Sequence, residues 1–304
     1  MKPAILNFMA IRQLTALTSL LLVLLSVLSL SISGLQLGLD FTGGTLIELS
    51  YGAPAPLDLI RVTLEKRGFD NALVQSFGSP TEVLIRLATS YRPGVGEEVQ
   101  QLLQQATESK VSLLRTEFVG AQVGEDLRER SGLGVLVALG AIMLYVTFRF
   151  QFKFALGALV ALFHDVIIVL GAFSLFRWEF DLTVLAAILA VIGYSLNDSL
   201  VVADRIRENF RRLRLDDTCE IINRSLTEIL SRTLMTSLTT LLVVVALFLF
   251  GGEMIHGFAT ALLIGISVGT YSSIYVASDL LLRMNFRRED LVPPDTEPQE
   301  DARP

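Results

Sequence analysis

The sequence is poor in the residues that build disulfide frameworks, metal clusters and nucleotide sites. Its 304 residues include a single cysteine, Cys219, which excludes an internal disulfide. Two histidines, His164 and His256, with one cysteine argue against a structural zinc site. No glycine-rich loop of the pattern G-x-x-x-x-G-K-[ST] is present, which argues against nucleotide hydrolysis as the energy source. We therefore expect no metal, no organic cofactor and no enzymatic activity.

Charge is also scarce, and its distribution matters more than its sum. Charged residues make up 18% of the chain and hydrophobic residues 52%, with a formal net charge of -6. A soluble domain of this size seldom carries so much apolar sequence, so the composition indicates an integral membrane protein.

Six apolar runs are long enough to cross a bilayer as helices. We predict spans at 14–33, 132–150, 154–176, 182–202, 234–250 and 258–282. The first run could instead be a cleaved signal peptide ending near Ser31–Ser33, but it exceeds the ~7–15 apolar residues of such a segment, which favours an uncleaved span. Within 131–285, residues 204–232 read as a charged, amphipathic connection, and 286–304 as a disordered tail.

Basic residues gather on one side of this predicted topology. Residues 1–13, the 149–153 turn, the 204–232 connection and residues 283–288 carry the lysines and arginines, whereas the opposite short turns carry only Arg177. The positive-inside rule places both termini in the cytoplasm of a bacterial inner membrane and segment 34–130 outside it.

Segment 34–130 is predicted to form one small domain. Strand patterns at 45–51, 72–77, 83–88 and 111–119 alternate with helix patterns at 56–67 and 96–107. This order is that of a split βαβ, or ferredoxin-like, α+β domain.

Asp198 is the residue around which we organise the functional prediction. Asn197 and Asp198 interrupt an apolar helix, where a charged side chain costs roughly 3 kcal/mol or more. The plain alternative is a structural polar contact between helices. We predict instead that Asp198 and Asn197 serve ion coupling.

Arg232 is predicted to partner Asp198 from the entry of the fifth span. Its plain alternative is an anchor at the lipid surface. Burial favours an uncharged acid and a guanidinium favours the carboxylate, so moving between the two settings would load and release a proton. The following hydroxyls, Thr233, Thr236 and Ser237, are predicted to line a wet path.

Two further polar features stand in the predicted spans and their connections. Asp165 lies mid-span beside His164 and is predicted to take part in proton or ion coupling, either paired with Arg232 or Asp198 or in a water-filled cavity. His164 alone reads as a neutral, hydrogen-bonded histidine. Asp40, Gly43 and Gly44 follow the first span, and we predict a turn or hinge there rather than a ligand site.

Four stretches resemble the SecD/SecF family. They are Gly38–Thr45 (GLDFTGGT), His164–Val166 (HDV), Ile192–Asn209 (IGYSLNDSLVVADRIREN) and Ser231–Ser237 (SRTLMTS), and the third is similar to the SecF branch in particular. The resemblance covers nearly all of residues 1–285. One departure is Ser199, where the family commonly has threonine; the hydroxyl is kept.

The resemblance implies a function and a set of partners. Such a chain pairs with SecD, so that two six-span halves form a twelve-span unit of the resistance-nodulation-division type, and works with the SecYEG channel, a YajC-like subunit and a translocating preprotein. It implies protein export driven by the proton-motive force, with Na⁺ as the alternative ion, Asp198 as the coupling acid and Arg232 as its partner. Nucleic acid has no place in it.

Three other functions stay open on the sequence. One is a proton-coupled exporter of small molecules or lipids from the same superfamily, and another is a scaffold of the translocon that conducts no ions. The third is an intramembrane protease, which would require the carboxyls of Asp165 and Asp198 to meet.

Overall fold

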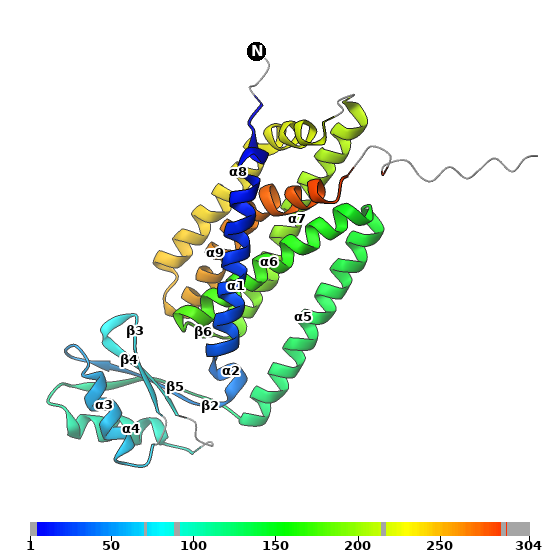
Figure 1. The fold of residues 1–304 in the computed structure, drawn as a ribbon. Helices are drawn as coiled ribbons and strands as arrows, with labels where there is room; N and C mark the ends of the chain where they lie inside the picture. Colours follow the sequence, from blue (N-terminus) through cyan, green and yellow to red (C-terminus); the bar gives the residue numbers. More distant parts are fainter. Residues whose placement is uncertain (1–4, 70–71, 88–91, 214–216, 287–289, 291–304) are drawn as a thin grey trace, which may run out of the picture.

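The protein consists of a bundle of long helices with a small α+β domain at one end (Figure 1). This computed structural model describes residues 5–69, 72–87, 92–213, 217–286 and 290, so most of the tail predicted at 286–304 lies outside the described residues. We call the end of the bundle that carries the α+β domain the domain end. The opposite end, where α1 begins and α9 finishes, is the terminal end.

Six helices of the described chain are long and apolar enough to cross a membrane. They are α1 (Arg12–Ser33), α5 (Ala121–Arg149), α6 (Phe152–Phe176), α7 (Leu182–Arg212), α8 (Thr218–Phe250) and α9 (Glu253–Arg283). The predicted fold class, a six-span helical membrane protein with a small α+β domain, is thereby confirmed.

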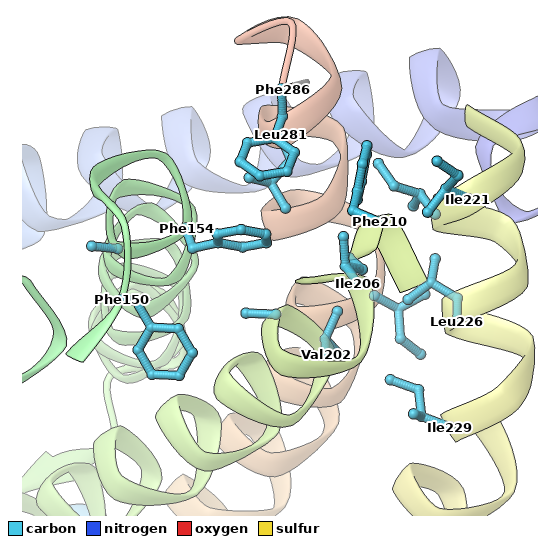
Figure 2. Close-up of a cluster of buried hydrophobic side chains, with 14 of the residues drawn as sticks. Phe150, Phe154, Val202, Ile206, Phe210, Ile221, Leu226, Ile229, Leu281 and Phe286 are labelled. Carbon is cyan, nitrogen blue, oxygen red and sulfur yellow. The ribbon is translucent and has the colours of Figure 1, made fainter. Parts of the chain in front are cut away.

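The predicted amphipathic connection at 204–232 consists of the ends of two long helices. Helix α7 continues to Arg212, and α8 begins at Thr218. Both extensions bury an apolar stripe in one cluster at the terminal end, where Ile206 and Phe210 of α7 meet Ile221 and Leu226 of α8 (Figure 2). Charges occupy the outer faces of the two helices, as the amphipathic pattern predicted.

The α+β domain has the ferredoxin-like order predicted for it. Strands β2 (Gly44–Tyr51), β3 (Leu73–Phe77), β4 (Ser79–Leu87) and β5 (Val111–Val119) form one antiparallel sheet in the order β3-β4-β2-β5. Helices α3 (Leu57–Glu65) and α4 (Val95–Ala106) follow β2 and β4. Alternate residues such as Ile47, Leu49 and Ile85 are fully buried. Every second side chain of a strand points to the same face of the sheet, and these point to the face that the helices cover.

Tyr51, at the end of β2, places a polar hydroxyl in this apolar core. Its side chain is 3% exposed and, within the described part of the chain, its hydroxyl has no hydrogen-bond partner. Burial raises the pKa of Tyr51 from 10.0 to about 12. Because the folded state disfavours the phenolate, ionisation of Tyr51 leaves the free energy of unfolding unchanged below pH 10 and lowers it as the pH rises through about 12.

We expect Tyr51→Phe to stabilise the domain by about 1 kcal/mol, because an unpaired buried hydroxyl is costly. Amide exchange of the sheet in the full-length chain measures the effect. The native protein should lose protection between pH 10 and pH 12 more steeply than the variant. Equal pH profiles would contradict this assignment.

A second, two-stranded ladder joins the segment after α1 to the turn before α7. Here β1 (Gln36–Leu37) runs parallel to β6 (Glu179–Phe180), and the short helix α2 (Leu39–Thr42) follows β1. Near the start of the chain, the 3-10 helix η1 (Phe8–Ile11) precedes α1. These elements are too short to leave a periodic signal in the sequence.

Helix α9 packs closely on α7 because small residues face it. A Cβ added at Gly265 would lie 2.2 Å from the side chain of Val191, and one at Gly269 would lie 3.2 Å from Ser195. Small residues allow membrane helices to approach in this way. By contrast, α5 stands apart from the bundle along most of its length (Figure 1).

Candidate functional site

Asp198 lies midway along α7 and points into the protein. Its side chain is 5% exposed, and in the described chain its Oδ2 atom has no hydrogen-bond partner. Ser199, the next residue, is also buried with an unpartnered hydroxyl. A buried carboxyl oxygen without a donor is unusual, which marks this position as a candidate site.

Arg232 lies at the depth predicted from the sequence but makes no fixed ion pair. Asp198 is 14 residues before the end of α7 and Arg232 is 14 residues after the start of α8. At 1.5 Å per residue, both are about 21 Å from the connection between the helices. The guanidinium exerts a Coulomb attraction on Asp198, yet the described residues show no salt bridge within 4.0 Å for either group. Arg232 is exposed in the isolated chain.

The other residues predicted around this pair divide between two faces. Asn197 is exposed, so it does not share the buried position of its neighbour Asp198. Thr233 and Ser237, one turn apart on α8, are buried toward the bundle. Thr236 is exposed and bonds to the carbonyls of its own helix. Of the three hydroxyl residues predicted to line a path, Thr233 and Ser237 therefore face the bundle and Thr236 does not.

Asp165 is the most deeply buried acid of the bundle, with no exposed surface. On α6, its Oδ1 lies 2.9 Å from Nδ1 of His164. Its Oδ2 accepts hydrogen bonds from Ser195 of α7 at 2.5 Å and from Ser272 of α9 at 2.8 Å. Asp165 thus joins three helices, rather than pairing with Arg232 or Asp198 as the sequence suggested.

Three consecutive residues of α9 extend this polar layer across the bundle. Thr270 shares a 2.7 Å hydrogen bond with Ser237 of α8, and Tyr271 donates to the carbonyl of Thr15 of α1 at 2.8 Å. Ser272 completes the set through Asp165. We name Thr270, Tyr271 and Ser272 the polar triplet. Its partners could not be read from the sequence, because a serine in a membrane helix commonly bonds to its own backbone.

Other chemistries find no support in this geometry. The oxygens of Asp165 are occupied by His164, Ser195 and Ser272, and in the described chain they form no hydrogen bond with Asp198, so no aspartyl pair is assembled. Among the described residues, no group of three or more histidine, cysteine, aspartate or glutamate side chains gathers in a way that could hold a metal ion.

The predicted turn at Asp40, Gly43 and Gly44 is held firmly against α7. Asp40 Oδ2 accepts a hydrogen bond from the backbone N–H of Leu182, the first residue of α7, at 3.0 Å. Gly43 and Gly44 both have positive φ, at 67° and 125°. Asp40 belongs to the single-turn helix α2, and Gly43 and Gly44 lead from it into β2.

Arg86 of β4 adds an ionic contact to the same joint. It pairs with Glu179 of β6 and donates to the carbonyl of Leu37 of β1 at 3.2 Å, with 13% of its side chain exposed. The sheet of the α+β domain is therefore bound to the segment that leads into α7.

We expect Arg86→Ala to loosen this joint. Losing a half-buried charge-assisted contact of about 1.5 kcal/mol should raise the opening of β1 and β6 about tenfold. Amide exchange of residues 36–43 and 179–182 in the full-length chain measures this opening. Arg92→Ala removes an exposed pair with Glu98 and serves as the control. Equal exchange in the two variants would contradict the role given to Arg86.

At the terminal end, a second set of contacts fixes α7 to α8. Asn209 of α7 is fully buried and donates to Glu228 of α8 at 2.9 Å. Glu228 also lies 3.5 to 3.6 Å from the guanidinium groups of three arginines, Arg205, Arg212 and Arg224. This cluster ties the end of α7 to the first half of α8.

Comparison with known proteins gives consistent matches over the whole chain. The profile described as "Protein export membrane protein SecD/SecF, C-terminal" matches residues 98–287, and the "SecD/SecF GG Motif" matches residues 28–55. A "Protein translocase subunit SecF" of Pseudomonas aeruginosa is 51% identical over 299 residues, covering 98% of this chain and 97% of that protein. One of Vibrio alginolyticus is 50% identical and covers 96% and 93%.

A solved structure has the same fold. The crystal structure of SecDF from Thermus thermophilus, a translocon-associated membrane protein, superimposes with a TM-score of 0.85 at 40% identity. The superimposed region covers 93% of this chain and 39% of the longer SecDF chain. A second structure of SecDF, in a "Super-membrane-facing form", gives a TM-score of 0.69 at 41% identity.

Proposed function

Because the chain belongs to the SecD/SecF family, we propose that it uses an inward flow of protons through its bundle to assist protein export. Its role is SecF-like, in Sec-dependent translocation of proteins across a membrane, and it associates with a SecD half. The proposal concerns the energy source and the residues that use it. The protein acts as an accessory subunit without catalytic chemistry.

The observation that carries the proposal is the state of Asp198. It is buried, and among the described residues one of its oxygens has no hydrogen-bond partner and its candidate cation, Arg232, attracts it without forming a salt bridge. A permanently paired aspartate could not easily gain or lose a proton, and an exposed one would titrate without consequence for the helices. Asp198 lies between these cases, so binding a proton changes its attraction to Arg232.

The surface of the isolated chain is consistent with a partner beside this site. Arg232 and Asn197 are exposed, and large apolar side chains of α5 and α8 such as Phe148, Leu242 and Phe250 are more than half exposed. Lipid and a SecD half would cover these faces. We further assign the terminal end to the cytoplasm and the α+β domain to the outer side of a bacterial inner membrane, where SecYEG, a YajC-like subunit and the emerging preprotein are the expected partners.

Export into inverted membrane vesicles tests the proposal. Vesicles with the SecD partner and this chain should import a preprotein faster when a proton gradient is imposed, and a protonophore should remove the difference. A sodium ionophore should leave it unchanged. Stimulation that follows a sodium gradient alone would overturn the choice of ion, and equal export without the chain would overturn the role.

A further inference from the structure

Asp165 and its hydroxyl partners form a second set of titratable contacts that the Asp198 mechanism does not use. Asp165 has no exposed surface, and Ser195 and Ser272 are 1% and 0% exposed. In the described chain, no lysine or arginine forms a salt bridge with Asp165; its one ionisable contact is His164. Something other than a fixed cation must therefore accommodate the charge of this acid.

The Ser272 hydroxyl can accommodate either charge state of the acid. Its Oγ lies 2.8 Å from Asp165 Oδ2 and 3.1 Å from the carbonyl oxygen of Gly269. With a carboxylate, Ser272 donates to Oδ2 and Asp165 accepts from Ser195 as well. With a carboxylic acid, the new O–H on Oδ2 donates to Ser272, and Ser272 turns its hydrogen toward Gly269. No heavy atom has to move between the two arrangements.

His164 offers the bound proton a second position. A carboxylate can only accept, so it requires the Nδ1 atom of His164 to carry hydrogen. That leaves Nε2 as an acceptor, and Nε2 is buried without a partner in the described chain. An added proton can rest on Nε2 as an imidazolium beside the carboxylate, or on Oδ2 as the acid beside a neutral imidazole.

Few other titratable groups lie near Asp165 and His164. From α9 the neighbouring titratable group is Tyr271, whose ring centre lies 6.3 Å from that of His164. From α7 it is Asp198, one helical turn beyond Ser195. Helix α1 contributes Thr15 and Ser19, which bond to Tyr271 and do not titrate.

We propose that Asp165, with His164 and Ser272, is a second proton-binding site of the chain, separate from Asp198. Taking up one proton reverses the hydrogen bond between Asp165 and Ser272: the acid donates to the Ser272 hydroxyl, which turns its own hydrogen toward the carbonyl of Gly269. The inference rests on the proposed function in that both sites draw on the same proton gradient.

Infrared difference spectroscopy of the full-length chain in liposomes, recorded between high and low pH, tests the site directly. We expect a carbonyl stretch of a protonated carboxyl group that persists in Asp198→Asn and is lost in Asp165→Asn. Ser272→Ala should shift its frequency, because the acid loses its acceptor. Ser273→Ala is the matched control, since this equally buried neighbour donates to the carbonyl of Thr270 in its own helix and should leave the band unchanged.

Each outcome separates this site from the Asp198 mechanism. If Asp198→Asn removes every such band, Asp198 is the only proton site and the present inference fails while the proposed function stands. If Asp165→Asn does not fold, an unshifted band in Ser272→Ala overturns the inference by itself. In the vesicle assay, Ser272→Ala should lower gradient-stimulated export about tenfold relative to Ser273→Ala.

Discussion

Replacing Asp198 with asparagine is expected to abolish the stimulation of export by a proton gradient while leaving gradient-independent export in place. One elementary charge crossing 100 mV supplies about 2.3 kcal/mol, a bias of about fiftyfold on a two-state rearrangement. Asparagine has nearly the shape of aspartate but no proton to exchange. The whole of this bias should therefore vanish, whereas the packing of the buried side chain should remain.

The control for this experiment lies on the same helix. Asp204→Asn removes an exposed carboxylate of α7, six residues beyond Asp198, and should retain the native stimulation. Inverted vesicles with equal amounts of each variant and of the SecD partner provide the comparison, with the imposed pH difference as the variable. Native-like stimulation in Asp198→Asn would refute the role of this acid.

Replacing Gly44 with alanine should have the second large effect, on stability rather than on coupling. Gly44 has a φ of 125°, and an added Cβ would lie 2.6 Å from the carbonyl oxygen of Leu87. That carbonyl belongs to β4, which pairs with β2 along six positions and cannot easily move away. Strain and overlap together should cost at least about 3 kcal/mol.

Gly34→Ala separates the cost of backbone strain from the cost of steric overlap. Gly34 also has a positive φ, at 62°, but a Cβ there would meet no atom within 4 Å. It should cost about 1 kcal/mol, the strain alone. Thermal unfolding of the two purified variants compares their global stability. Amide exchange of β2 and β4 then measures the local effect near Gly44. Equal protection in both would show that the Leu87 contact is unimportant.

The sequence predicted the architecture well because its signals are long and periodic. Six apolar runs of membrane length and the alternating strand patterns of 45–51 and 111–119 were sufficient for the spans and the ferredoxin-like order. The segment 204–232 was predicted to be amphipathic, but the ends of α7 and α8 within it were not, because its many charges hide where each apolar span stops and its helical extension begins. The β1–β6 ladder joins residues 143 positions apart, and two-residue strands leave no pattern.

The site was predictable in its residues more than in its contacts. Asp198, Arg232 and Asp165 stand out because charges are costly in a bilayer. The sequence could not say that Asn197 and Arg232 are exposed in the isolated chain, since this depends on how α7 and α8 are rotated in the bundle. Nor could it distinguish Ser272 from Ser273, which lie side by side but bond to different partners.

Helix α7 is one uninterrupted rod of 31 residues, about 46 Å long, with Asp198 close to its midpoint. Asp40 accepts a hydrogen bond from the first residue of α7, and Glu228 accepts one from Asn209 near its last residue. A rod that pivots near its centre behaves as a see-saw: a rocking motion of about 10° would carry each tip about 4 Å, in opposite directions. A displacement of the arginines around Glu228 would therefore move the end of α7 that contacts the segment leading to the α+β domain. A displacement of that domain would likewise move the terminal end of α7.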